Sequence, residues 1–480
     1  MVVLMAAMFA GGGAAASEAP AKGPETRTRH LLLDSRIVGN TENAKLCVGT
    51  VKKHPDNPLF GEDKPWEQRY DNMYPSVIHD EADGLYKLWY DPFIYDNSAK
   101  GMTLAQRHAK GYRNGRREDG TCYATSRDGL KWEKPELGLV AYEGRKENNL
   151  VLRGAHGPGV FKDAHDPDPA RRYKMFHARD VLRFSPDGLH WSCAEPCNGI
   201  DSNSDTHNNM LWAPDLGRYV AIVRLRSGAD RCSGERVVAR SESVDLKTWT
   251  RAVEVLRIGE HGREAYSMPT FRYAGIYLGL LGVFRTKEDR VHTELAWSPD
   301  SVTWQRIDPG TPLIGNSANE GEYDWGCVYA AACPVVLDDE IRIYYLGSNG
   351  NHTSWREGFF CLATLRPDEW AGYEQVAPDQ PAVVVTREIP YAGQQLRITA
   401  NVGMGGSVKV SVVDRDGKQL SAAQPVTATV TDGELRWDRQ IKAAAIQLRF
   451  ELSGAKLYSF SSRFKLAELD RRFGEQRQHP

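Results

Sequence analysis

The heptapeptide Ser126-Arg-Asp128-Gly129-Leu-Lys-Trp132 decides the fold, because it returns along the chain with little variation. Further copies begin at Ser185, Ser243 and Ser298, and a shortened fifth copy is Arg366-Pro-Asp368-Glu-Trp370. The tryptophans that close the five copies are 59, 58, 55 and 66 residues apart. A near-constant period of this length is typical of repeat architectures.

Each repeat contains the same succession of strand-like runs. In the first repeat these are residues 74–78, 86–90 and 122–125, and we expect a fourth, outer strand after the tryptophan, at residues 139–142. One sheet of this size cannot bury both faces alone, so the sheets must stack, and radial stacking gives a β-propeller. Five copies predict five blades. An immunoglobulin-like β-sandwich is the alternative, although its strands would not repeat with a period near 58 residues.

The composition changes after Tyr373, and the chain divides accordingly. Residues 374–381 look like a linker, and residues 382–470 alternate between apolar and polar side chains, as in a small antiparallel β-sandwich. The predicted fold class is all-β, a five-bladed β-propeller followed by a small C-terminal β-sandwich. The predicted segments are a signal peptide and leader (1–22), a lead-in (23–64), the propeller (65–373) and the sandwich (382–470).

The first 17 residues are apolar and rich in small side chains, but they lack the basic residues with which a signal peptide usually begins. They resemble a secretory signal peptide with cleavage near residues 14–16, which predicts a secreted or periplasmic protein. Eight cysteines then permit disulfides, and Cys193 and Cys197 form the closest candidate pair. Buried free thiols are the alternative reading for four others that sit in apolar runs: Cys122, Cys327, Cys333 and Cys361.

Charge and hydropathy exclude two classes of partner. The chain of 480 residues has 61 Lys and Arg against 63 Asp and Glu, a formal net charge of −2, and no long basic run, so we expect no nucleic acid. No later apolar run approaches transmembrane length, so we expect no membrane association after signal removal. The 12 Trp and 20 Tyr can fill a core or provide platforms for sugar rings.

Four acids stand at equivalent positions just before the first strand of four repeats: Asp71, Asp205, Glu264 and Asp324. The second repeat has His156 there instead. In a propeller these positions lie at one end of the central channel, together with the residues that follow the second strands. Those residues are Asp91, His177, Arg179, Arg224, Arg226, Arg285 and His352. The predicted substrate-binding residues are His177, Arg224, Arg285, His352, His207 and Tyr266.

Several carboxylates with Arg and His at one channel mouth suit glycoside hydrolysis, which needs one carboxyl as proton donor and another as base or nucleophile. Each acid alone can also be a turn or strand-start residue that faces water. The Asp of the repeated heptapeptide differs from these acids, since we expect it to cap its own turn while the Trp packs between blades. No metal-ligand spacing is evident, so no cofactor is predicted, and a Ca²⁺ site stays open.

With these motifs the chain resembles the five-bladed propeller glycoside hydrolases of families 32, 43, 62, 68 and 130. The likeness rests on the repeats, on Tyr74-Pro-Ser-Val, on Val160-Phe-Lys-Asp163, on Arg172-Tyr-Lys-Met, and on the blade-closing run 358–366 followed by a sandwich. In families 32 and 43 the resemblance implies an Asp nucleophile or base, an Asp stabiliser and a Glu proton donor on the first three blades. Asp71 fits the first role, the second blade offers only Asp163, and the third offers Asp205 in place of Glu. The family 32 signatures Trp-Met-Asn-Asp-Pro-Asn and Glu-Cys are absent.

The sequence therefore predicts an exported glycoside hydrolase that acts on a poly- or oligosaccharide. Its predicted residues are Asp71 as nucleophile or base, Glu264 as proton donor and Asp205 as stabiliser, with Asp324 in reserve. The alternative is a non-catalytic carbohydrate-binding propeller. A separation of more than about 10 Å between the acids would favour it. A sialidase-type enzyme fits less well, because its Asp-box places Asp and Trp five residues apart, whereas Asp128 and Trp132 are four apart.

Overall fold

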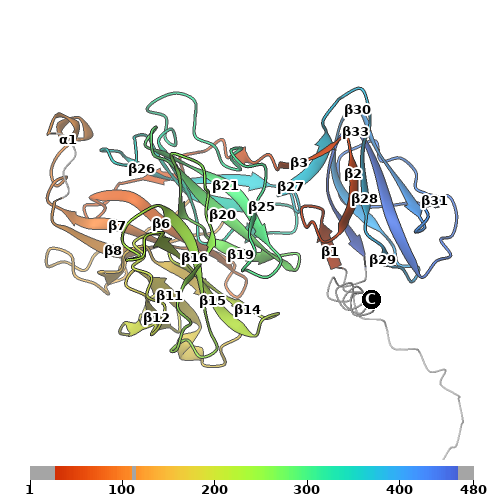
Figure 1. Ribbon diagram of the computed structural model, residues 1–480. Helices are drawn as coiled ribbons and strands as arrows, with labels where there is room; N and C mark the ends of the chain where they lie inside the picture. The colour runs from red at the N-terminus through yellow and green to blue at the C-terminus, as the bar shows by residue number, and fades with distance from the viewer. Residues whose placement is uncertain (1–27, 111–114, 463–480) are drawn as a thin grey trace, which may run out of the picture.

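The computed structural model describes residues 28–110 and 115–462, whose regular secondary structure is almost entirely β-strand (Figure 1). The helices in these ranges are α1 (Leu104–Lys110) and the 3₁₀ helix η1 (Pro169–Arg171). Neither is long and apolar enough to cross a membrane. The predicted signal peptide, residues 1–22, lies outside the described residues.

Three four-stranded antiparallel sheets follow one another along the chain, and we call them groups one to three. Group one is β6 (Arg69–Asp80), β7 (Leu85–Asp96), β8 (Arg117–Ser126) and β9 (Leu150–Arg153). Group two is β10 (Gly159–Lys162), β11 (Tyr173–His177), β12 (Val181–Ser185) and β13 (Glu195–Pro196). Group three is β14 (Asn209–Ala213), β15 (Arg218–Arg226), β16 (Arg236–Ser243) and β17 (Val253–Leu256).

Groups four and five share one eleven-stranded sheet, which the single parallel pairing of Val291 with Cys327 joins. Group four is β18 (Arg263–Ser267), β19 (Thr270–Tyr273), β20 (Ile276–Arg285), β21 (Arg290–Ser298) and β22 (Gln305–Arg306). Group five is β23 (Cys327–Ala330), β24 (Val335–Val336), β25 (Ile341–Ser348) and β26 (Gly358–Leu365), with β4 (Lys52–Lys53) and β5 (Phe60–Gly61) paired to β26.

The five groups form a closed ring. Each group contacts the next, and β25 and β26 of group five return to β6 of group one. The outermost strands of group five come from the N-terminal lead-in, since β4 and β5 pair antiparallel with β26. The ring is therefore fastened by a segment that precedes it in the sequence.

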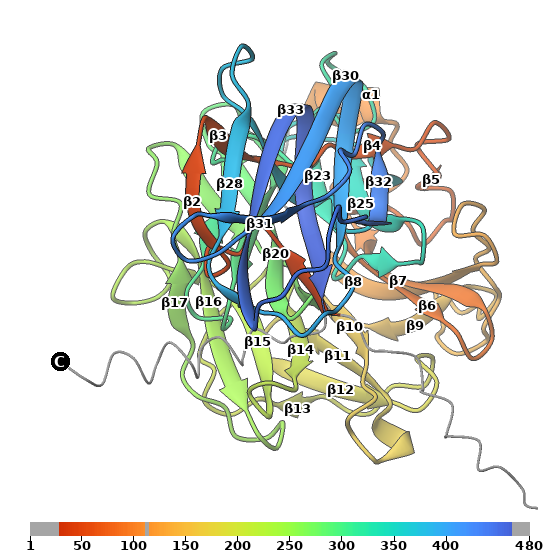
Figure 2. The same cartoon turned by 90° about the vertical axis from the view of Figure 1, so that its right-hand side faces the viewer.

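The N-terminal strands also enter a separate ten-stranded sheet at the C-terminal end of the chain, which stands beside the ring (Figures 1 and 2). This C-terminal sheet contains β1 (Thr28–Leu31), β2 (Val38–Glu42), β3 (Ala44–Val48), β27 (Ala371–Gln375), β28 (Ala382–Thr386), β29 (Ile389–Pro390), β30 (Arg397–Val413), β31 (Gln419–Ala422), β32 (Val430–Glu434) and β33 (Ala445–Ser462). The long strands β30 and β33 pair with each other around one apolar core.

The predicted outer strand of group one is wrong in position. Residues 139–142 form no strand, and β9 (Leu150–Arg153) pairs with β8 instead. Leu139 and Tyr142 turn their side chains into neighbouring apolar clusters. Asn148 fixes the intervening loop by donating to the Val140 carbonyl at 2.8 Å. The apolar run is used for packing, and the edge of the sheet is filled by the next run along the chain.

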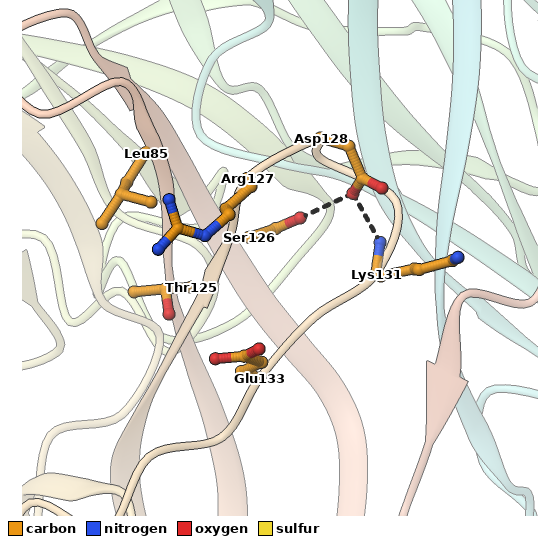
Figure 3. Close-up of a pocket in the computed structure, with 7 residues that line it drawn as sticks. All are labelled: Leu85, Thr125, Ser126, Arg127, Asp128, Lys131 and Glu133. Carbon is orange, nitrogen blue, oxygen red and sulfur yellow. Dashed lines mark hydrogen bonds between the residues drawn. The ribbon is translucent and has the colours of Figure 1, made fainter.

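The repeated heptapeptide forms the turn that the sequence predicts. In the first copy the Asp128 carboxylate accepts from the Ser126 hydroxyl at 2.9 Å and from the backbone N–H of Lys131 at 2.8 Å (Figure 3). It also accepts from the backbone N–H of Leu130 at 2.8 Å. The same bonds recur at Asp187, Asp245 and Asp300. The prediction that this Asp caps its own turn is confirmed. A shallow surface cavity of about 370 Å³ lies over the first copy.

Each repeat tryptophan packs against the preceding group, as predicted. The Trp132 ring lies 5.8 Å from Tyr344 and 5.4 Å from Phe360 of group five, and Trp370 lies 5.2 Å from Phe271 of group four. Trp191, Trp249 and Trp304 share apolar clusters with groups one, two and three respectively. All eight cysteines are free thiols, so the candidate pair Cys193 and Cys197 forms no disulfide.

Candidate functional site

A strained bulge in β6 is the strongest structural pointer to a site. The pairing of β6 with β7 jumps from Arg69 opposite Phe93 to Met73 opposite Asp91, so four steps on β6 match two on β7. Asp71, Met73 and Tyr74 have φ angles of 52°, 56° and 43°. Such left-handed conformations of non-glycine residues are unfavourable and gather at functional sites. The bulge presents Asp71, Asn72 and Tyr74.

Asp71 is held as a carboxylate by two arginines. Its Oδ1 accepts hydrogen bonds from Arg69 Nη2 at 2.8 Å and from Arg356 Nη2 at 3.0 Å. Burial alone raises the pKa of Asp71, but the Arg356 and Arg69 guanidinium groups outweigh burial and hold that pKa well below its usual range. The Asp71 side chain is 19 % exposed, so a ligand can reach it.

Asn72 connects the bulge to group four. Its Nδ2 donates to the hydroxyl oxygens of Tyr74 at 2.7 Å and Tyr266 at 3.0 Å, and its Oδ1 accepts from Arg356 Nη2 at 2.9 Å. Two more guanidinium groups lie over the Tyr266 ring, that of Arg224 at 5.2 Å and that of Arg236 at 5.6 Å from its centroid. Tyr266 is thus the centre of a cluster drawn from groups one, three, four and five, which we call the Tyr266 cluster.

Two of the other three predicted acids border this cluster through its arginines. The Glu264 carboxylate pairs with Arg236, and its side chain is 21 % exposed. The Asp205 carboxylate pairs with Arg224 and is 72 % exposed, on the loop before β14. The structure therefore brings Asp71, Glu264 and Asp205 to the edge of one cluster, where each forms an ion pair with an arginine.

Two predicted histidines belong to the same cluster and are neutral. The His352 ring lies 4.9 Å from Tyr266, and its Nδ1 is 2.8 Å from the Tyr329 hydroxyl. The His207 ring lies 5.5 Å from Tyr74. Burial lowers the pKa of His352 to about 3 and that of His207 to about 4, so neither carries charge at neutral pH.

Three predicted site residues have other partners. Asp324 is fully buried, with Lys53 Nζ at 2.6 Å and the Tyr345 hydroxyl donating at 2.9 Å. Arg285 pairs with Glu288 at 2.8 Å and donates to Asn316 at 2.8 Å. His177 accepts from Arg183 Nε at 3.3 Å, and burial together with Arg183 lowers its pKa to about 4. The environment of Asp324 is that of a residue that fastens β4 to group five.

A second polar cluster lies beside the bulge and joins Asp91, Asp119 and His156. His156 Nδ1 is 2.7 Å from Asp119 Oδ1 and 3.6 Å from Asp91 Oδ2, and the Gly157 N–H donates to Asp91 Oδ2 at 2.9 Å. Burial and the neighbouring Asp119 raise the pKa of Asp91 well above its usual range. Burial lowers the pKa of His156, but Asp119 and Asp91 outweigh burial and raise it to about 9.

The sequence indicates some residues of the two clusters and gives no indication of others. His156 stands where the second repeat lacks its acid, and Asp91 follows a second strand, so both positions carried a signal. Asp119 lies in a polar segment between two predicted strands, at a position that the other repeats do not share. Arg69 and Asn72 flank Asp71 in the sequence and could have been inferred from adjacency, whereas Arg356 lies 285 residues from Asp71 in a loop and had no signal.

Comparison with known proteins gives structural matches alone. No protein-family model matches the chain, and no curated protein matches it. A solved glycoside hydrolase is 16 % identical with a TM-score of 0.44, over 67 % of this chain and 92 % of that one. A β-1,2-mannobiose phosphorylase from Listeria innocua is 14 % identical with a TM-score of 0.45, over 66 % and 96 %. An N-acetylgalactosamine deacetylase from F. plautii is 15 % identical with a TM-score of 0.43, over 68 % and 97 %. The solved structures that match include glycoside hydrolase-like propeller proteins, the group that the sequence resembles.

Proposed function

We propose that the protein is an exported glycoside hydrolase that cleaves a poly- or oligosaccharide. In this proposal residues 65–373, completed by β4 and β5, form a five-bladed β-propeller, and residues 382–470, completed by β1–β3 and β27, form a β-sandwich domain. Residues 1–22 serve as the signal for export to a secreted or periplasmic location. The closed succession of five strand groups and the tryptophan wedges between them support the propeller assignment.

The observation that carries the proposal is that two partly exposed carboxylates, Asp71 and Glu264, both border the Tyr266 cluster. Asp71 reaches Tyr266 through Asn72, and Glu264 reaches it through Arg236. A pair of carboxyl groups across a ligand is the arrangement that glycoside hydrolysis uses. Asp71, kept ionised by Arg69 and Arg356, acts as nucleophile or base.

The remaining roles follow from the same geometry. Glu264 donates the proton to the leaving oxygen, and a substrate that displaces Arg236 from Glu264 would free this carboxyl. Asp205 with Arg224 stabilises the substrate from the exposed loop before β14. Arg224 and Arg236, whose guanidinium groups lie over the Tyr266 ring, offer N–H donors, which suit a ligand rich in hydroxyl groups.

A screen for sugar release tests the proposal. Wild-type protein incubated with a panel of oligosaccharides should release reducing sugar, and Asp71→Asn and Glu264→Gln should each lower kcat by about 10²- to 10⁴-fold. Asp201→Asn is the matched control, because Asp201 is a 53 % exposed carboxylate near Asp205 in the sequence whose partners, Arg231 and Arg251, lie outside the Tyr266 cluster. Full activity in both test variants would refute the assigned roles. Oligosaccharide binding without release would favour the non-catalytic binding propeller.

A further inference from the structure

We propose that Asp91, Asp119 and His156 form a binding site for one divalent transition-metal ion beside Asp71. The inference concerns ion binding alone and does not depend on the proposed hydrolase activity. It goes beyond the sequence, in which no metal-ligand spacing is evident.

The spacing of the three side chains fits a shared ion. One ligand atom from each residue lies within 4.8 Å of the other two. His156 Nδ1 is 2.7 Å from Asp119 Oδ1 and 3.6 Å from Asp91 Oδ2. Two ligands on an ion with bonds of about 2.1 Å are roughly 3.0–3.4 Å apart in octahedral or tetrahedral geometry. Small side-chain adjustments would therefore bring all three atoms to bonding distance.

Asp91 supplies an independent sign that a ligand belongs here. Its side chain is only 2 % exposed, and among the described residues its Oδ1 has no hydrogen-bond partner. A buried carboxylate oxygen without a partner is costly, and a cation is one of the few groups that can compensate it. Its other oxygen, Oδ2, is fixed by the Gly157 N–H, which orients the carboxylate as outer contacts orient metal ligands.

The donor set indicates the class of ion. Ca²⁺ and Mg²⁺ prefer sites built of oxygen atoms, whereas imidazole favours Zn²⁺ and its first-row neighbours, and carboxylates also suit Mn²⁺. One imidazole with two carboxylates therefore favours Zn²⁺ or Mn²⁺. The Asp119 and His156 side chains are 24 % and 26 % exposed, so three protein ligands leave one side of the ion open to water or substrate.

The site is assembled by the fold and adjoins the strained bulge. Asp91 lies on β7, Asp119 on the neighbouring β8, and His156 in the segment between β9 and β10. Asp91 stands opposite Met73 in the β6–β7 register, two residues from Asp71. An ion held there would be next to the Asp71 carboxylate.

Calorimetric titration of the full chain tests the site. Protein stripped with a chelator is titrated with ZnCl₂ and with MnCl₂, and we expect one ion per chain for at least one of them. Asp119→Asn and His156→Gln should each weaken this binding at least about tenfold. His190→Gln is the matched control, because His190 Nδ1 also lies 2.7 Å from a carboxylate oxygen, that of Asp187, but without a second acid. The control should bind as the wild type does.

Thermal melts guard against a folding defect. The ion should raise the Tm of the wild type and of His190→Gln, and should leave the Tm of Asp119→Asn unchanged. If His156→Gln does not fold, Asp119→Asn decides, since its side chain is partly exposed and its substitution is isosteric. The proposal fails if neither ion binds at millimolar concentration, if Asp119→Asn binds like the wild type, or if the control loses affinity equally. Binding of CaCl₂ in place of both ions would overturn the assigned class.

Discussion

One oxygen atom, Oδ1 of Asp71, accepts hydrogen bonds from two guanidinium groups, and this determines the charge that the site presents. Arg356 also bonds to Asn72, so it sets both the ionisation of Asp71 and the position of its neighbour. At the scale of single residues, the arginines therefore set the ionisation of Asp71.

Arg356→Met should shift the pH dependence of the proposed activity. Removal of the Arg356 charge leaves the burial of Asp71 opposed mainly by Arg69, so the pKa of Asp71 rises. The acidic limb of kcat/KM against pH should move upward by about one to three units. A pH–rate profile of variant and wild type measures this. An unmoved acidic limb in an active variant would show that Asp71 is not the ionised group.

The buried neutral His352 should make the protein sensitive to acid. The unfolded chain takes up the proton near pH 6.5, whereas folded His352 does so only near pH 3, because burial and then Arg356 lower its pKa. This histidine therefore contributes stability above pH 6.5 that is lost as the pH falls toward 3. At pH 5 the loss is about 2 kcal/mol.

Urea unfolding at pH 7 and pH 5 checks this. The decrease in the free energy of unfolding between the two pH values should be smaller in His352→Gln by about 2 kcal/mol. Equal decreases in variant and wild type would contradict the assignment of this effect to His352.

The sequence selects candidate site residues where they occupy a periodic position. Asp71, Glu264 and Tyr266 follow from the register of the first strands, and His156 marks the exception in that register. Arg356 and Asp119 lie in segments without a period, so only the folded chain brings them to Asp71 and Asp91. The candidate acids stand at positions that the sequence indicates, but the groups that shift their pKa values do not.

At the scale of elements, the repeat turn needs a left-handed residue in its fourth position. Gly129 and Gly188 have φ angles of 73° and 80°, and Leu246 and Ser301 adopt 64° at the equivalent positions. Gly188 is further constrained by contact, since a Cβ there would lie 2.5 Å from Cζ2 of Trp89 in group one. Both the conformation of the turn and the packing against group one therefore require glycine at position 188.

Gly188→Ala should lower the free energy of unfolding by about 2–4 kcal/mol, the sum of left-handed strain and overpacking against Trp89. Gly217→Ala is the control, because Gly217 has a φ of 62° but a Cβ there would meet nothing within 4 Å. The control should lose only about 1–2 kcal/mol. Chemical denaturation of both variants measures the difference, and equal losses would mean that the Trp89 contact is unimportant.

Strand prediction succeeds at this scale where a run has both its pattern and a nearby partner. The second strand of each repeat is found because it lies between two neighbours close in sequence, as β7 does between β6 and β8. The outer strand β9 is missed because residues 139–142 are equally apolar. In the folded chain Asn148 donates to the Val140 carbonyl and Asn149 to the Tyr123 carbonyl, which fixes both sides of this loop.

At the scale of the whole molecule, the ring depends on an ion pair between its first and last parts. Lys53 of β4 neutralises Asp324, whose side chain is fully buried before β23. Pairings of this kind had no local signal, because β4 and its partner β26 are separated by almost the whole ring. The sequence therefore predicts only a lead-in at residues 23–64, whereas this segment supplies strands to both the ring and the C-terminal sheet.

Lys53→Met should destabilise the protein by about 3–5 kcal/mol, since it leaves the buried Asp324 carboxylate without its cation. Asp324→Asn should also lower the free energy of unfolding but should leave kcat unchanged, in contrast to Asp71→Asn. Denaturation and initial rates on the same preparations separate the two effects. A large loss of kcat in a fully folded Asp324→Asn variant would return Asp324 to the catalytic residues.

The pairing of β1 with β33 also has a consequence for how the chain reaches its final state. His30 contacts Ser462 across 432 residues, so the C-terminal sheet cannot be completed until nearly the entire polypeptide is available. Contacts between such distant segments carry a large loop-closure entropy and slow the search for the native topology. A growing chain therefore holds β1 without its partner until β33, the last of the described strands, has been synthesised.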